Sequence, residues 1–289
     1  MSDPTPAPAW FVDALAQEPE RRTVDVDGTT VAYRAWGEAG APVVVLVHGG
    51  AAHSGWWDHV APFLAPGRRV LAPDLSGHGD SDHRARYDLA TWAGEVMAVA
   101  AAEGSQRPAV LGHSMGGFVT LTAAVDPRYS LLGAAAIDSP VRAMSSEARA
   151  WQDKHPTLPP HKVHPTREAV EARFKTLPSD DATLEYVRAH IASGSVRQVE
   201  GGWSWKFDPR IFFSARMEPE ALAAAPGPIA LVRGERGMAT TDITDSVASM
   251  LGGHVPVTLV PDSGHHIMLD QPLALIGVLQ TLLGEWSRP

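Results

Sequence analysis

One short segment combines the residue types that nucleophilic catalysis needs. It reads GHSMG at residues 112–116, with apolar residues at 109–111 before it and small or apolar residues at helical spacing over 117–124. A serine between a strand and a helix, with glycine two residues to either side, can occupy a sharp, strained turn, because a bulky side chain at either flank would clash with neighbouring backbone. Such a turn would hold the Ser114 hydroxyl out at the carboxyl edge of a sheet. We therefore predict that Ser114 is a nucleophile.

A serine that attacks a carbonyl also needs hydrogen-bond donors for the oxyanion that develops. The segment HGGAAH, residues 48–53, follows a continuous apolar run. Glycines at the end of a central strand let a backbone N–H face the reacting oxygen with no side chain in the way. The N–H of Gly50 is the first candidate donor, with Ala51 as its alternative. The N–H of Met115, beside the nucleophile, is the second.

These segments need a parallel sheet to bring them together. The run PVVVLV at 42–47 is typical of a central strand that is buried on both faces. Further strands are expected at 69–73 and 109–111, and helices at 87–102 and 117–124. Residues 21–36 alternate around Asp27-Gly28, which favours an antiparallel hairpin. Strands and helices in alternation predict an α/β fold with helices on both faces of the sheet.

Composition excludes several classes of function. The chain has 289 residues, a formal net charge of −9 and no cysteine. The acidic balance argues against nucleic acid or an anionic membrane as a partner, and the lack of cysteine excludes disulfides and thiolate nucleophiles. No apolar run reaches transmembrane length and the first residues lack a signal-peptide pattern, so we expect a cytoplasmic protein. His161 and His164 are too few for a metal site and no nucleotide fingerprint is present, so we expect neither a metal nor a cofactor.

Four motifs together resemble the α/β-hydrolase fold family. They are the HGG loop at 48–50, the DLSGHGDSD turn at 74–82, the GHSMGG elbow at 112–117 and the SGHH segment at 263–266. The resemblance covers nearly the whole chain outside residues 141–217. It implies an eight-stranded, mostly parallel sheet with a catalytic triad in the chain order serine, acid, histidine.

The resemblance also points to the general base. His265 lies directly after the glycine of SGHH, which is the family position of that base, and His266 is its rival. An imidazole suits the role because its proton affinity lies near working pH. It can take the serine proton and return it to the leaving group.

The acid departs from the commonest family pattern. The usual acid position, three residues after Gly234, holds Gly237, which cannot orient an imidazole. In some relatives the acid follows the strand that comes after the elbow helix. Here that strand is expected at residues 131–137, and Asp138 comes directly after it. Both strands end at the same carboxyl edge, so either carboxylate could reach the histidine. We select Asp138, with Glu235 and Asp242 as alternatives.

An inserted cap explains why the connection after residue 140 is much longer than a helical crossover needs. We expect an N-terminal arm and short helix at 1–20, a core at 21–140 and 218–289, and a helical cap at 141–217, inserted after the sixth strand. Aromatic residues of the cap and of the oxyanion loop are our candidates for the substrate pocket, since an apolar lid over the serine needs such residues. They are Trp203, Trp205 and Phe207 in the cap and His53, Trp56 and Trp57 in the loop.

The expected activity is that of a serine hydrolase acting by acyl transfer. The resemblance implies an ester, thioester or lactone with an apolar part as the substrate, with no cofactor. Three other functions of this fold stay open: a cofactor-free lyase, a perhydrolase or haloperoxidase-like enzyme on the same triad, and a small-molecule receptor with slow turnover. A homodimer is a further possibility.

Overall fold

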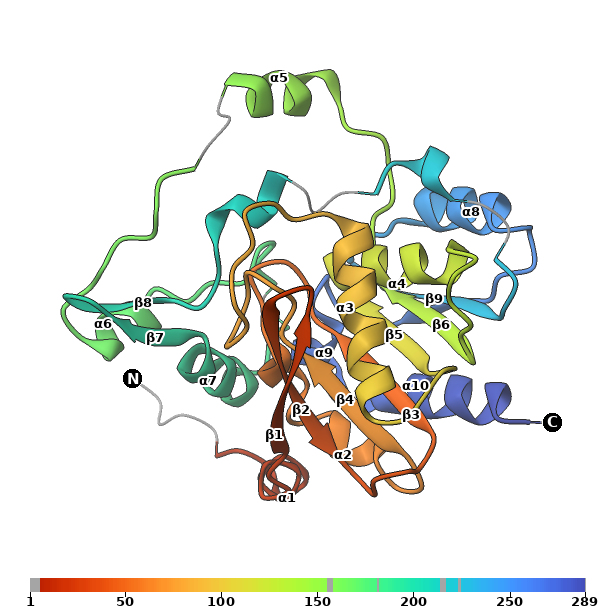
Figure 1. Ribbon diagram of the computed structural model, residues 1–289, viewed down its shortest axis with the longest axis horizontal. Helices are drawn as coiled ribbons and strands as arrows, with labels where there is room; N and C mark the ends of the chain where they lie inside the picture. The colour runs from red at the N-terminus through yellow and green to blue at the C-terminus, as the bar shows by residue number, and fades with distance from the viewer. Residues whose placement is uncertain (1–5, 155–157, 181, 214–216, 223–224, 289) are drawn as a thin grey trace.

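The computed structural model describes residues 6–154, 158–180, 182–213, 217–222 and 225–288. Its centre is an eight-stranded sheet in the order β1-β2-β4-β3-β5-β6-β9-β10 (Figure 1). The strands are β1 (Glu20–Val26), β2 (Thr29–Trp36), β3 (Val43–Val47), β4 (Arg69–Pro73), β5 (Ala109–His113), β6 (Gly133–Ile137), β9 (Ile229–Gly234) and β10 (Val257–Val260). From β4 to β10 all neighbours are parallel, whereas β2 is antiparallel to β1 and β4. The predicted eight-stranded, mostly parallel sheet is confirmed.

The antiparallel edge follows from local sequence. Asp27 and Gly28 both have positive φ, 51° and 74°, which is the conformation that a two-residue turn between antiparallel strands requires. The turn joins β1 to β2 with Val26 opposite Thr29. The N-terminal helix α1 (Ala9–Leu15) precedes this hairpin, and residues 1–5 of the predicted arm lie outside the described residues.

Helices cover both faces of the sheet because successive side chains of a strand point to opposite faces. In β3, Val43, Val45 and Val47 pack into one core and Val44 and Leu46 into the other. Helices α3 (Leu89–Ala102), α4 (Met115–Val125) and α8 (Thr241–Met250) contribute to the first core, and α1, α2 (Ala61–Leu64), α9 (Ile267–Asp270) and α10 (Pro272–Trp286) to the second (Figure 1). Strands β3 and β5 are fully buried, so the turns that leave their carboxyl ends are held on rigid supports.

The sequence led us to expect a helical cap in the long connection between β6 and β9. The structure differs, because this connection also contains two strands. It holds helices α5 (Ser146–Lys154), α6 (Arg167–Glu171) and α7 (Glu185–Gly194), a hairpin of β7 (Val196–Val199) and β8 (Gly202–Trp205), and the short 3-10 helices η2 (Pro209–Phe213) and η3 (Pro219–Ala221). A further 3-10 helix, η1 (Ser54–Trp57), lies in the core. The hairpin turns at Gly201 and Gly202, whose φ angles are 80° and 149°. The alternating stretch Val196–Trp205 therefore forms strands, because glycine permits the reversal between them.

Among the described helices, none combines the length and the apolar character that crossing a membrane would require. We refer to residues 141–217 as the cap segment; in Figure 1 its helix α5 lies farthest from the sheet.

Candidate active site

Ser114 occupies a strained turn between β5 and α4. Its φ is 54°, in the left-handed region that non-glycine residues rarely adopt. A Cβ on Gly112 would lie 2.1 Å from the carbonyl oxygen of Gly116, and a Cβ on Gly116 would lie 2.4 Å from that of Val47. The flanking glycines are therefore needed for the chain to fold tightly enough at this point, and the hydroxyl of Ser114 faces a cavity at the carboxyl end of the sheet.

A chain of hydrogen bonds links Ser114, His265 and Asp138. Nε2 of His265 lies 3.0 Å from Oγ of Ser114, and Nδ1 of His265 lies 2.5 Å from Oδ2 of Asp138. Because a carboxylate can only accept, the proton sits on Nδ1 of His265, and Nε2 is left to accept from the serine hydroxyl. The imidazole thus has the tautomer and the orientation of a general base directed at Ser114.

Asp138 is fully buried and its carboxylate is held by backbone donors. The N–H of Met238 donates to Oδ2 at 2.8 Å, and the N–H groups of Gly234 and Ala239 donate to Oδ1 at 3.2 and 3.4 Å. A Cβ on Gly237 would lie 2.0 Å from Oδ1. The glycine at the usual acid position therefore leaves the space that the carboxylate of Asp138 fills.

The alternative residues do not reach this arrangement. Glu235 is exposed and accepts from the N–H of Asp262, and Asp242 accepts from the Thr240 hydroxyl at the start of α8. His266 is buried beside His265, with ring centroids 4.7 Å apart, and burial lowers its pKa to about 3. A group with so low a pKa is a poor proton acceptor at neutral pH.

His113 is a neighbour of the site that sequence reasoning did not single out. Its Nε2 donates to the carbonyl oxygen of His265 at 2.9 Å, and burial holds its pKa well below the ordinary value. A neutral His113 fixes the backbone that carries the base. In the described part of the chain, His113, His265 and His266 form the group whose ring nitrogens, within 4.8 Å of one another, could share a metal ion. Both ring nitrogens of His265 already have partners, Ser114 and Asp138.

The two candidate oxyanion donors lie on the same cavity as Ser114. Gly50 and Met115 both line it, one after β3 and the other as the first residue of α4. The first N–H groups of a helix have no partner within the helix, and its dipole favours negative charge at this end. The backbone of Met115 can therefore donate to an oxyanion bound at Ser114.

The cavity at Ser114 has a volume of about 270 Å³. Apart from Ser114, His265 and Arg142, its lining is apolar: Gly50, Met115, Phe118, Pro140, Leu177, Phe212, Met217 and Met238. Most of these residues come from segments far apart in the chain and carry no local pattern that would have identified them.

None of the six candidate pocket residues lines this cavity. Trp57 is completely buried in the core, and Trp56 is buried against His266, with ring centroids 5.4 Å apart. His53 accepts from the N–H of Gly55 and contacts the Ser195 hydroxyl at 3.1 Å, so it joins the oxyanion loop to the end of α7. Burial lowers the pKa of His53 to about 3. These side chains thus support the loop and do not face the cavity.

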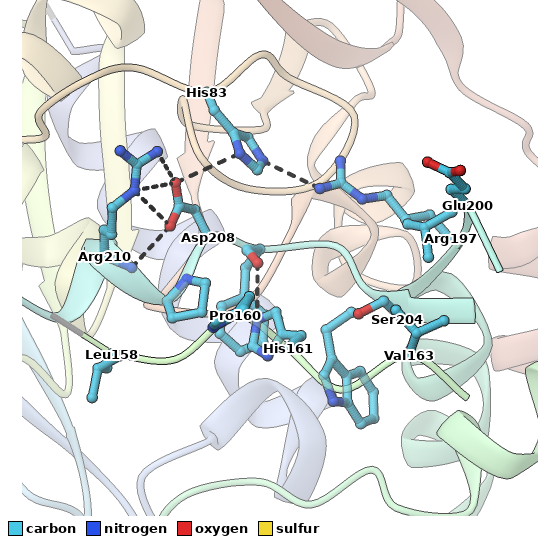
Figure 2. Close-up of a pocket in the computed structure, with 14 residues that line it drawn as sticks. His83, Leu158, Pro160, His161, Val163, Arg197, Glu200, Ser204, Asp208 and Arg210 are labelled. Atoms are coloured by element: carbon cyan, nitrogen blue, oxygen red, sulfur yellow. Dashed lines mark hydrogen bonds and ion pairs between the residues drawn. The ribbon is translucent and has the colours of Figure 1, made fainter. Parts of the chain in front are cut away.

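The cap aromatics lie elsewhere. Trp205 and Phe207 line a second cavity, of about 480 Å³, between the cap segment and the core loop that carries His83 (Figure 2). Trp203 forms a β-bridge with His164, and the guanidinium of Arg167 lies 5.8 Å from its ring centroid. The ring of Phe207 packs edge-on against that of Phe212, which lines the cavity at Ser114, at 5.9 Å between centroids.

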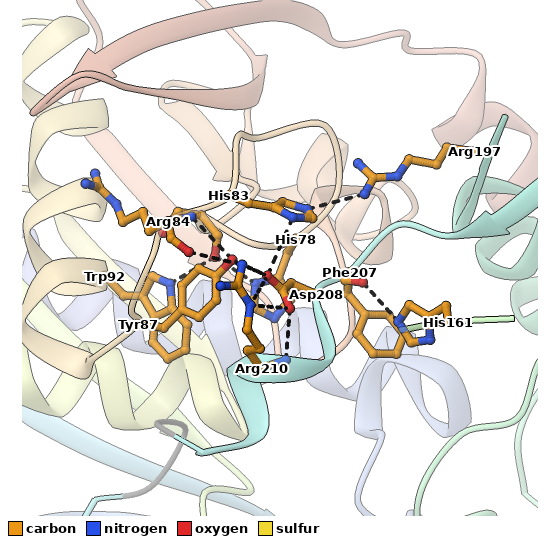
Figure 3. A network of polar contacts seen from close by, with 11 residues as sticks. His78, His83, Arg84, Tyr87, Trp92, His161, Arg197, Phe207, Asp208 and Arg210 are labelled. Atoms are coloured by element: carbon orange, nitrogen blue, oxygen red, sulfur yellow. Dashed lines mark hydrogen bonds and ion pairs between the residues drawn. The ribbon is translucent and has the colours of Figure 1, made fainter. Parts of the chain in front are cut away.

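Polar contacts hold the cap segment to the core loop beside this second cavity (Figure 3). Asp208 accepts from the hydroxyl of Tyr87 at 2.8 Å and pairs with the guanidinium of Arg210. Burial alone would raise the pKa of Asp208, but the hydrogen bonds from Arg210 and Tyr87 hold it at about 2. Lys206 pairs with Asp80 at 2.6 Å. The hydrogen bond from Tyr87 to Asp208 and the ion pair of Lys206 with Asp80 therefore join this end of the cap segment to the core.

Comparisons with known proteins agree with the observed fold. The model of the alpha/beta hydrolase family matches residues 44–278. An esterase of Mycobacterium tuberculosis is 28% identical over 264 residues, covering 86% of this chain and 84% of that protein. The 3-hydroxybutyrate-oligomer hydrolase of Cupriavidus necator is 28% identical over 272 residues, covering 81% and 86%. The solved thioesterase domain from the curacin biosynthetic pathway superposes with a TM-score of 0.76 at 22% identity, over 90% of this chain and 99% of that one.

Proposed function

This chain belongs to the α/β-hydrolase family, and from that premise we propose that it is a serine hydrolase that cleaves a carboxylic ester, thioester or lactone through an acyl-enzyme intermediate. The observation that carries the proposal is the hydrogen-bonded series Ser114, His265, Asp138 on the wall of a largely apolar cavity. The names of the relatives, an esterase and an oligomer hydrolase, support the same bond type.

In the first half of the reaction, Oγ of Ser114 attacks the carbonyl carbon while Nε2 of His265 takes its proton. Asp138 keeps the imidazole in place and stabilises the positive charge that forms on it. The N–H groups of Gly50 and Met115 donate to the oxyanion of the tetrahedral intermediate. When this intermediate collapses, His265 gives the proton to the leaving oxygen or sulfur, and the acyl group stays on Ser114.

In the second half, His265 takes a proton from a water molecule, which attacks the acyl carbon. Collapse of the second intermediate releases the carboxylic acid and returns the proton to Ser114. No group other than water is consumed. An apolar substrate fits the lining of the cavity. The cytoplasmic location, the absence of membrane and nucleic-acid partners and the homodimer stay predictions.

The proposal is tested by the fate of solvent oxygen. In water enriched with ¹⁸O, hydrolysis of 4-nitrophenyl butyrate is expected to place one solvent oxygen in the butyrate and none in the 4-nitrophenol, because water attacks the acyl carbon. Mass spectrometry of the two products measures this. Solvent oxygen in the 4-nitrophenol in place of the butyrate would contradict attack at the acyl carbon. Turnover only with added hydrogen peroxide would favour a perhydrolase, and ligand binding without turnover would favour a receptor.

Gly237→Ala is expected to lower kcat for the same ester by about 100-fold or more. The new Cβ would occupy the position of the Asp138 carboxylate, and displacing a catalytic group by about 1 Å costs on the order of 100-fold. Steady-state kinetics measures the loss. Gly284→Ala in α10, where an added Cβ meets no atom within 4 Å, is the matched control and is expected to keep full activity. Full activity in Gly237→Ala would show that Asp138 does not act in this position.

A further inference from the structure

Arg142 is the one permanently charged side chain on the described wall of the cavity at Ser114. It follows Asp138 by four residues, at the start of the connection from β6 to α5. The same wall carries the apolar side chains of Phe118, Leu177 and Phe212. The guanidinium of Arg142 is therefore the positive charge that a substrate bound beside Ser114 meets on this wall.

Arg142 differs in its contacts from three cationic residues near the other end of the cap segment, Arg197, Lys206 and Arg210. Arg210 pairs with Asp208, and Arg197 donates to His83 at 3.3 Å (Figures 2 and 3). Lys206 pairs with Asp80. Within the described residues, Arg142 has neither a hydrogen bond nor an ion pair, and its side chain is exposed. Its five N–H donors are thus available to a molecule in the cavity.

The acidic group closest to Arg142 in the sequence does not neutralise it. Asp138 is completely buried, and its oxygens accept from His265 and from three backbone N–H groups. The remaining polar groups on the wall, Ser114 and His265, are occupied with each other. The described lining of the cavity contains no Asp or Glu side chain, so a ligand can supply the negative charge that complements Arg142.

We propose that Arg142 binds a carboxylate carried by the substrate, so that this chain hydrolyses esters in which the acyl part or the alcohol part is an anion. This rests on the proposed function, because it assigns the substrate class of the same site. A planar guanidinium can hold a carboxylate through two parallel hydrogen bonds, which fixes the direction of the substrate as well as its affinity. The scissile carbonyl is then at Ser114 while the charged end is at Arg142.

The test compares esters that differ only in charge. On the acyl side the pair is 4-nitrophenyl hydrogen adipate and its terminal carboxamide. On the alcohol side it is 4-acetoxybenzoate and 4-acetoxybenzamide. The wild type is expected to prefer the carboxylate in at least one pair, and the pair that shows the preference identifies which part of the substrate reaches Arg142.

Arg142→Gln is expected to reduce kcat/KM for the preferred carboxylate ester by about 10- to 100-fold, mainly through KM, the range for a lost charge-assisted hydrogen bond. The loss for the neutral partner is expected to be much smaller, so that the preference for the carboxylate ester disappears in Arg142→Gln. Arg142→Lys should recover part of the loss, because it keeps the charge but not the paired donors. Arg21→Gln removes the same charge from the exposed edge strand β1 and should change neither substrate.

Two outcomes would overturn the assignment, and they are distinguishable. Equal efficiency for both members of each pair, unchanged in Arg142→Gln, would refute the role of Arg142 and leave the hydrolase proposal intact. No hydrolysis of any of the four esters, together with no covalent labelling of Ser114 by a fluorophosphonate, would refute the proposed function and this inference with it.

Discussion

Ser114→Ala is expected to reduce kcat/KM for the best ester by a factor on the order of 10⁴ or more. Without Oγ there is no acyl-enzyme, and His265 loses the hydroxyl that lies 3.0 Å from its Nε2. The oxyanion donors and the cavity remain, so a small residual rate above the uncatalysed reaction is expected. Steady-state kinetics with 4-nitrophenyl butyrate measures the loss.

The intact mass after brief exposure to a fluorophosphonate gives an independent measurement. The wild type is expected to gain one adduct and Ser114→Ala none. Ser130→Ala, which changes an exposed serine outside the site, should label as the wild type does. An adduct of the same yield on Ser114→Ala would contradict the assignment of the nucleophile, as would unchanged turnover.

Asp138→Asn is expected to lower kcat by about 10³- to 10⁴-fold with little change in the fold. An amide has nearly the shape of the carboxylate but carries no charge to stabilise the imidazolium. Its NH₂ group can also donate to Nδ1 of His265, which would favour the wrong tautomer. The kinetics should be measured together with the rate of fluorophosphonate labelling, because both depend on an activated Ser114.

The two alternative acids supply matched controls. Glu235→Gln and Asp242→Asn each remove one carboxylate near the same edge, where each carboxylate binds to a neighbouring loop or helix end and not to His265. Both variants are expected to keep kcat within about twofold. A large loss in either variant, combined with normal labelling of Asp138→Asn, would transfer the role of the acid to that residue.

Local sequence was sufficient to predict the turns and strands that position the site. The elbow around Ser114, the hairpin at Asp27-Gly28 and the buried strand β3 all follow from residues that are neighbours in the chain. Backbone conformation at a glycine-flanked turn and burial of a β-branched run are short-range properties. The motifs also predicted the order along the chain of the serine, acid and histidine that meet at the carboxyl edge of the sheet.

Tertiary structure decided which side chains surround the reacting atoms. The sequence showed that Gly237 leaves the usual acid position without a carboxylate, but it left three candidates for the acid, Asp138, Glu235 and Asp242. The distance of 2.5 Å between Asp138 and His265 distinguishes Asp138 from the other two. It indicated aromatic walls at Trp57 and Trp205, whereas the fold buries the first and turns the second to another cavity. Composition predicts that an aromatic side chain is buried, but not against what, because its neighbours are set by the packing of segments distant in the chain.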